Sequence, residues 1–244
     1  MNCQNSYGKF VEDGRGFAIN TPNTPSAWVN YLYNDSFQSE IDQVLGGVSR
    51  FVINYKQTPF TDGGGGDYTE SAPMTQGKLA MGFVTPITNR TEAFAAMQVL
   101  NTLFGAGMTS KLFMNVREKM SLCYHIGSGY YGSKGIMTVS AGIDCSKEPV
   151  ARQEILHQLE LCRQGEITAE ELGAAKEAVL SGLRGIYDSP GSIEGFFSVA
   201  AIGGLALTVE QYRQAVENTT LADVVAAAKT LKLHTTYFLK GVEA

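Results

Sequence analysis

The sequence predicts an α+β fold, a two-layer α/β sandwich in which helices cover one face of a mixed or antiparallel sheet. Strand-like segments come first and in the middle of the chain, whereas helix-like segments cluster after residue 148. This order is typical of a sheet with helices packed on one side. Hydrophobic residues make up 44% of the 244 residues, which is enough to bury a real core.

The first quarter of the chain is expected to contain two helices and one strand. A helix should begin near Thr24-Pro25, because Thr can cap a helix and Pro suits its first position. A strand is expected over residues 41–45 and a short helix over residues 50–55. The four glycines Gly63–Gly66 predict a flexible loop, and they lack the Gly-Lys-Ser/Thr ending of a phosphate-binding loop.

Regular periodicity begins near residue 76. In the expected helix 90–104, the apolar residues Phe94, Met97, Leu100 and Phe104 recur at three- and four-residue spacings. Further helices are expected at 109–119, 148–163 and 169–187, and the strands of one sheet at 41–45, 78–85, 121–131, 134–144 and 235–239.

Local signals define several helix ends. The Gly105-Ala-Gly107 stretch should end the first of these helices, and residues 188–191 are expected to form a turn. Three capping boxes, in which a Thr oxygen accepts from a backbone N–H and a side chain three residues later reaches back, are predicted at Thr168/Glu171, Thr208/Gln211 and Thr220/Asp223.

Charge and hydropathy exclude two classes of partner. The formal net charge is −5 and the pI about 5.3, without a basic cluster, so a nucleic-acid partner is not expected. No apolar run approaches the ~20 residues of a membrane helix, and the first residues lack a signal-peptide core, so we expect a cytoplasmic protein without a membrane partner. The cysteines Cys3, Cys123, Cys145 and Cys162 form no CxxC pair and are expected to be reduced.

The stretch from Phe104 to Tyr124 carries a more specific pattern. It combines a glycine-rich loop, a helix that ends in Arg-Glu-Lys at 117–119 and a strand that begins Leu-Cys-Tyr at 122–124. This pattern resembles the second-half domain of pitrilysin/insulinase family zinc peptidases, many of which have Gly where this chain has Ser121. The Ser-Leu-Cys-Tyr form is most similar to a bacterial, degenerate subfamily, and weaker matches extend the resemblance over residues 24–240.

The resemblance implies a non-catalytic C-terminal half, which forms a clamshell around a peptide substrate together with a similar half. It also implies that Arg117 and Tyr124 bind substrate. The planar fork of Arg117 suits peptide carbonyls or a carboxylate, and the Tyr124 hydroxyl could donate to a carbonyl oxygen as it becomes an oxyanion. The alternative is structural: Arg117 pairs with a nearby acid and Tyr124 fills a strand surface.

The zinc chemistry of the family's catalytic half is missing from this chain. That half uses His-x-x-Glu-His on a helix, where two His four residues apart bind zinc and Glu is the general base. The nearest approach here, His157-Gln-Leu-Glu-Leu161, has Leu at the second ligand position. The other histidines, His125 and His234, fall in predicted strands. We therefore expect no metal, cofactor or catalytic residue in this chain, and zinc only in a catalytic partner half.

The resemblance also suggests a domain organisation and partners. Residues 1–38 are interpreted as the tail of a preceding subdomain and residues 39–244 as the peptidase-like C-terminal domain. The expected partners are a peptide substrate and a catalytic half or homologous subunit, in a homo- or hetero-oligomer.

Two functions remain open. The chain is either an accessory half that takes part in proteolysis or a binding or structural subunit that has lost this role. A stand-alone hydrolase using Cys123 has less support. Its neighbour His125 would share one strand face with Cys123, but apolar strand cysteines are usually core residues.

Overall fold

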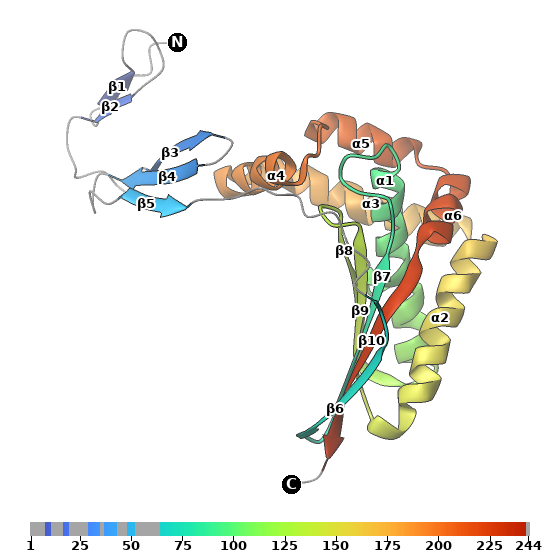
Figure 1. Cartoon of the computed structure of the whole chain (residues 1–244). Helices are drawn as coiled ribbons and strands as arrows, with labels where there is room; N and C mark the ends of the chain where they lie inside the picture. Colours follow the sequence, from blue (N-terminus) through green and yellow to red (C-terminus); the bar gives the residue numbers. More distant parts are fainter. Residues whose placement is uncertain are drawn as a thin grey trace. The chain divides into compact units, whose positions relative to one another are not determined.

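The structure is a computed structural model that describes residues 64–242 and, before them, the backbone of five short strands (Figure 1). The chain divides into two compact units, Met1–Pro59 and Phe60–Ala244, and each is described here by itself. The first unit ends at Pro59, and the domain boundary after residue 38 stays a prediction.

The first unit contains two small antiparallel sheets. Strands β1 and β2 form one pair, and β3, β4 and β5 form a three-stranded sheet in that order. Their bounds are Gly8–Phe10, Phe17–Ile19, Val29–Asn34, Phe37–Asp42 and Val48–Phe51.

Three predictions for this unit differ from the structure in the residues that it describes. Where a helix was expected after Thr24-Pro25, residues 29–34 form strand β3, and this segment is rich in Val and Tyr, which favour a strand. Of the strand expected at 41–45, residues 41–42 are the end of β4 and belong to the small sheet, and residues 43–45 lie outside the described residues. The short helix expected from residue 50 begins inside β5, and residues 52–55 lie outside the described residues.

The second unit is built on a five-stranded mixed sheet with the order β6-β10-β7-β9-β8. Only the β6–β10 pair is parallel. The strands are β6 (Asp67–Pro73), β7 (Gly77–Val84), β8 (Cys123–Tyr131), β9 (Ile136–Ile143) and β10 (Lys232–Val242). Four of the expected strands are confirmed, and β6 takes the place that the sequence gave to residues 41–45.

Most helices of the second unit lie on one face of this sheet, which confirms the predicted two-layer α/β fold, and the helix Pro190–Gly203 extends past the end of the sheet (Figure 1). The α-helices are α1 (Phe94–Asn101), α2 (Glu148–Gln164), α3 (Ala169–Arg184), α4 (Pro190–Gly203), α5 (Val209–Asn218) and α6 (Leu221–Thr230). Two π-helical segments, η1 (Thr102–Ala106) and η2 (Leu112–Lys119), follow α1, and the 3₁₀ segments η3 (Cys145–Lys147) and η4 (Gly185–Asp188) precede α2 and α4.

Helix α4 was not predicted. The sequence suggested a turn over residues 188–191, but Ser189 caps α4 by accepting from the Ser192 backbone N–H, and Pro190 is the first helical residue. Proline is favoured at this position because its missing N–H would have no intrahelical partner. All three predicted capping boxes are confirmed, at the starts of α3, α5 and α6.

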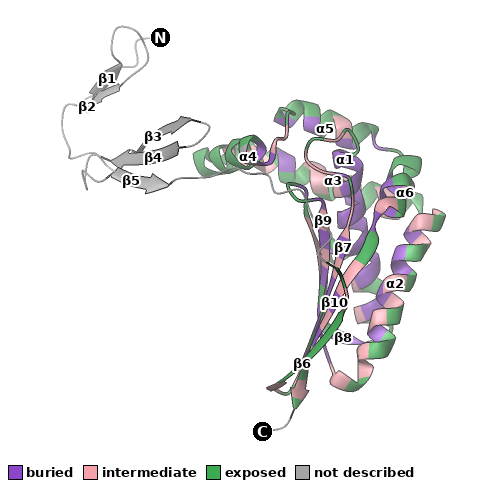
Figure 2. Cartoon of the chain, in the orientation of Figure 1, coloured by how far each residue is buried: buried purple, intermediate pink, exposed green. Residues whose placement is uncertain are grey.

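The core lies between the sheet and the helices (Figure 2). Alternate residues of β7, namely Leu79, Met81 and Phe83, are buried against this layer. From the helix side, Met97 and Phe104 are fully buried, as their spacing predicted. The intervening β7 residues are exposed or half-buried on the opposite face, so β7 reads as a strand covered on one side only.

Candidate functional site

The turn from η2 into β8 places Arg117 and Tyr124 close together. Arg117 lies in the last turn of η2, and Tyr124 is the second residue of β8, as the sequence predicted. Between them, the backbone N–H of Ser121 donates to the Arg117 carbonyl (3.0 Å), and that of Leu122 donates to the Val116 carbonyl (3.0 Å). These bonds use carbonyls that the helix end leaves without intrahelical partners.

Ser121 is the one non-glycine residue with positive φ (51°) in the described part of the chain. A side chain in this left-handed region crowds the following carbonyl, which explains why the resemblance places Gly here in many relatives. Ser121→Gly is therefore expected to raise the free energy of unfolding by about 0.5–1 kcal/mol, measured by urea denaturation.

The matched control is Ser140→Gly, at an exposed position of strand β9. At this position the change to glycine relieves no strain and only adds conformational entropy to the unfolded chain. It should therefore lower the free energy of unfolding by about 0.5–1 kcal/mol. Equal losses in both variants would contradict a strained backbone at Ser121.

A β-bulge at Tyr124 sets the orientation of the first β8 residues. Cys123 pairs with Ile143 and His125 with Gly142, so Tyr124 is the extra residue. As a result Tyr124 and His125 are both exposed, whereas Cys123 and Ile126 are buried. The expectation that Cys123 and His125 share one face was therefore wrong, because an unbroken strand was assumed. Burial also raises the pKa of the Cys123 thiol, although the nearby Arg117 charge opposes this, so Cys123 is a poor nucleophile.

Arg117 and Tyr124 line the same hollow, of about 330 Å³. Asp144, the first residue after β9, and Lys147, the last residue of η3, also line it. The Tyr124 hydroxyl donates to Asp144 Oδ1 (2.8 Å), and Lys147 Nζ lies 3.3 Å from Asp144 Oδ2. The hydrogen bond from Tyr124, together with that from Lys147, holds the pKa of the Asp144 carboxyl below its ordinary value.

The guanidinium of Arg117 is held more loosely. Within residues 64–242, Arg117 forms one ion pair, in which its Nε lies 3.7 Å from Glu118 Oε1. Its Cζ stacks 4.6 Å from the centroid of the Phe113 ring, and the side chain is 40% exposed. Arg117 has five N–H donors and makes one long ion pair within residues 64–242, so donors remain for a ligand at the hollow.

Sequence reasoning did not predict Asp144 and Lys147 as site residues. They follow strand β9, some twenty residues after Tyr124, and reach the hollow because β8 and β9 form an antiparallel pair. The start of β8 therefore lies beside the end of β9. The hairpin predicted over residues 121–144 could have indicated this contact, because the first residues of one strand of a hairpin lie beside the last residues of the other.

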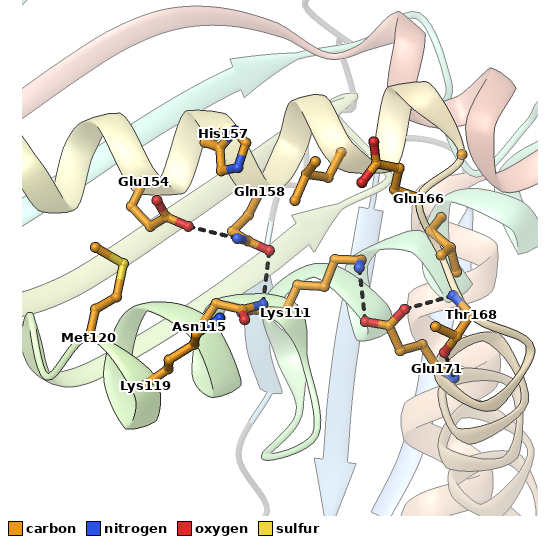
Figure 3. Close-up of a pocket in the computed structure, with 13 residues that line it drawn as sticks. Lys111, Asn115, Lys119, Met120, Glu154, His157, Gln158, Glu166, Thr168 and Glu171 are labelled. Atoms are coloured by element: carbon orange, nitrogen blue, oxygen red, sulfur yellow. Dashed lines mark hydrogen bonds and ion pairs between the residues drawn. The ribbon is translucent and has the colours of Figure 1, made fainter.

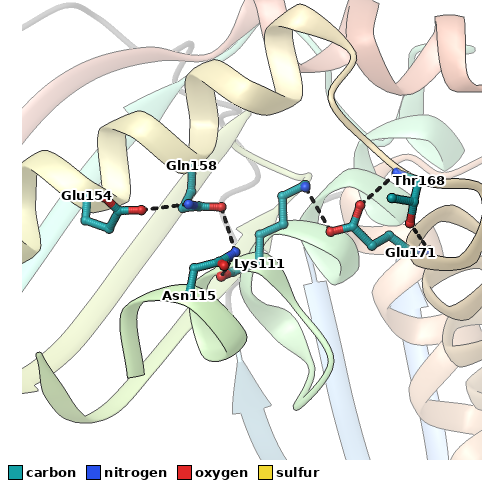
Figure 4. A network of polar contacts seen from close by, with 6 residues as sticks. All are labelled: Lys111, Asn115, Glu154, Gln158, Thr168 and Glu171. Carbon is teal, nitrogen blue, oxygen red and sulfur yellow. Dashed lines mark hydrogen bonds and ion pairs between the residues drawn. The ribbon is translucent and has the colours of Figure 1, made fainter. Parts of the chain in front are cut away.

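A larger hollow, of about 730 Å³, lies between η2, α2 and the start of α3 (Figure 3). Its polar side chains bond to one another (Figure 4). Lys111 Nζ donates to Glu171 Oε1 (2.8 Å), Asn115 Nδ2 to Gln158 Oε1 (3.0 Å), and Gln158 Nε2 to Glu154 Oε1 (2.7 Å). Because these groups already have partners, we interpret the network as structural.

Glu171 joins the network to the cap of α3. Burial would raise its pKa, but hydrogen bonds from the Lys111 ammonium and the Thr168 backbone N–H outweigh this effect and lower it. Glu171 is therefore an ionised partner for Lys111, whose side chain is only 7% exposed.

The three histidines of the sequence lie on three different elements. His157 is exposed on α2, and Leu161 stands where a second ligand would have to lie. His125 and His234 lie in β8 and β10. Among residues 64–242, no three His, Cys, Asp or Glu side chains are grouped so that they could hold a metal ion. None of the described helices is long and apolar enough to cross a membrane.

The second unit is a mixed five-stranded sheet with helices on one face, and the sequence contains no His-x-x-Glu-His motif. A family model described as Peptidase M16 inactive domain matches residues 35–179. The chain belongs to this family, and its resemblance to the non-catalytic half of pitrilysin/insulinase-type peptidases is confirmed.

Individual relatives agree with this assignment. The chain is 33% identical over 170 residues to a probable inactive metalloprotease, YmfF, of Bacillus subtilis strain 168, a match that covers 70% of this chain and 40% of that protein. A crystal structure of a conserved protein from Enterococcus faecalis V583 is 30% identical, with a TM-score of 0.69, and the match covers 74% of this chain and 43% of that one. The chain thus spans about two fifths of the length of these relatives.

One short match points elsewhere. Over 43 residues, 18% of this chain, it is 49% identical to a 3-O-beta-D-glucopyranosyl-beta-D-glucuronide phosphorylase of Paenibacillus borealis. The match covers only 6% of that protein, so it shows no shared activity.

Proposed function

We propose that this chain is the non-catalytic half of an insulinase-like zinc peptidase and that it binds peptide substrate at the hollow formed by Arg117 and Tyr124. The observation that carries the proposal is that these two residues, seven apart in sequence and on different elements, line one hollow. An Arg fork beside a Tyr hydroxyl is suited to the polar groups of a peptide backbone.

The proposal includes a partner. The relatives are more than twice as long as the segment of them that this chain matches. A catalytic half or homologous subunit would therefore supply the zinc and close a chamber over the peptide. The expected cytoplasmic location is kept as part of the proposal and rests on the sequence pattern alone.

Arg117→Ala is expected to weaken peptide binding by roughly ten- to a hundredfold, because a hydrogen bond to a charged group contributes about 1.5–3 kcal/mol. The measurement is fluorescence anisotropy of the full chain with a panel of short, labelled, unstructured peptides. The matched control is Arg213→Ala on α5, which removes the same charge from an exposed side chain 52% accessible to solvent. Equal affinities for the wild type and both variants would refute binding at this hollow.

The second candidate is a subunit with no role in proteolysis, which the name of the Bacillus subtilis relative favours. Both candidates allow peptide binding by the chain alone. They differ when a catalytic half is added: the accessory half should raise the cleavage rate of the bound peptide, and the non-proteolytic subunit should leave it unchanged.

A further inference from the structure

Tyr124 has one hydroxyl hydrogen, and the structure shows where it points. The hydroxyl oxygen lies 2.8 Å from Asp144 Oδ1 and donates to it. An ionised carboxylate can only accept hydrogen bonds, so the hydrogen in this contact has to come from Tyr124. What Tyr124 can still offer a ligand at the hollow is therefore the lone pairs of its oxygen.

Asp144 is itself held in place. Lys147 Nζ lies 3.3 Å from its other carboxylate oxygen and also donates to the Ser121 carbonyl (3.0 Å). Lys147 thus joins the carboxylate to the η2–β8 turn that carries Arg117. The hydrogen bond to Asp144 and its negative charge raise the pKa of Tyr124, so the tyrosine keeps its hydrogen at neutral pH.

We propose that Asp144 accepts the hydrogen bond of the Tyr124 hydroxyl and thereby makes the hollow a receptor for the backbone of an extended peptide, with one N–H donating to the Tyr124 oxygen and one C=O accepting from Arg117. This inference rests on the proposed function and specifies which ligand groups the site recognises. It replaces the oxyanion-donor role that the sequence suggested for Tyr124, because that role needs the hydroxyl hydrogen that Tyr124 already donates to Asp144.

The first test needs no ligand. The ionisation of Tyr124 is followed by NMR of protein labelled with ¹³C at the tyrosine ring, and Tyr124→Phe identifies its signal. Asp144→Ala should lower the pKa of Tyr124 toward the ordinary tyrosine value, and Asp144→Asn should shift it in the same direction. The control is Glu118→Gln, which removes a negative charge from the same hollow but does not contact the hydroxyl.

An unchanged Tyr124 pKa in both Asp144 variants, or an equal shift in the Glu118 control, would overturn the proposal. Asp144 is 40% exposed, so these variants are expected to fold, and thermal melts check this.

The second test uses the tightest-binding peptide of the panel and ester analogues of it, in each of which one N–H is replaced by oxygen. One analogue should bind the wild type about tenfold more weakly yet bind Tyr124→Phe as well as the parent peptide does. A loss of equal size in both proteins at every position would overturn the N–H assignment. If no peptide binds at all, the proposed function and the receptor role fail together. The NMR result still decides whether the Tyr124 hydroxyl donates its hydrogen bond to Asp144.

Discussion

Glu171→Gln is expected to lower the free energy of unfolding by about 3 kcal/mol, at the lower end of the cost of leaving a buried charge without its partner. Lys111 is 7% exposed and its ammonium lies 2.8 Å from Glu171. Glutamine has nearly the same shape and can still serve as the third residue of the capping box with Thr168. The variant therefore isolates the lost charge. The lower end applies because Glu171 is 29% exposed, so water reaches the site.

Two further variants make this prediction specific, all compared by urea denaturation. Glu170→Gln removes the same charge from the neighbouring, exposed position of α3 and should cost less than about 0.5 kcal/mol, the usual helix-dipole effect. Adding Lys111→Met to Glu171→Gln removes the stranded ammonium and should recover most of the loss. A double variant no more stable than Glu171→Gln would show that the charge of Lys111 is not the cause.

The same contact shows where sequence reasoning succeeds and where it ends. The capping box at Thr168 and Glu171 was predicted correctly, because both partners lie within one helical turn and the bond depends on local geometry. The ion pair with Lys111 was not predicted. The two residues are 60 positions apart, and nothing in the local pattern of either one indicates the other.

The sheet shows a similar limit. Strand β7 was predicted because it is covered on one face and alternates apolar with exposed residues. Strand β6 is an edge strand whose residues are almost all exposed, and its sequence, Asp-Tyr-Thr-Glu-Ser-Ala-Pro, carries no such alternation. Its parallel pairing with β10 joins residues near 70 and 240 and is a tertiary event.

For the candidate site, the sequence placed Arg117 and Tyr124 on the correct elements but not their surroundings. The β-bulge that exposes both Tyr124 and His125 adds one residue to β8 relative to β9. Such a shift in register depends on the pairing with β9 and not on the residues of β8 alone. The π-helical form of η2 has no signature in the residues themselves. Asp144, which determines what Tyr124 can offer a ligand, was visible in the sequence only as the end of a strand.

Gly105→Ala is expected to lower the free energy of unfolding by about 2 kcal/mol, within the usual cost of overpacking a core. Gly105 is buried at the end of η1, where a β-carbon would lie 2.7 Å from Ser128 Oγ and 2.8 Å from Leu112 Cδ1. Leu112 is fully buried, and Ser128 donates to Asn101 across the same contact, at 2.8 Å from its Oδ1. Neither neighbour can move without losing packing or a hydrogen bond.

Gly107→Ala, two residues further along the same glycine-rich stretch, is the matched control. A β-carbon there meets nothing closer than the Thr102 carbonyl oxygen at 4.0 Å, and φ is −139°, which alanine adopts readily. This variant should change stability by less than about 0.5 kcal/mol or raise it slightly, because alanine restricts the unfolded chain. Urea denaturation of both proteins checks the pair. Equal losses would mean that the two glycines serve only as a helix breaker, as the sequence alone suggested, whereas a loss confined to Gly105→Ala would show that the close approach of η1 to β8 requires glycine.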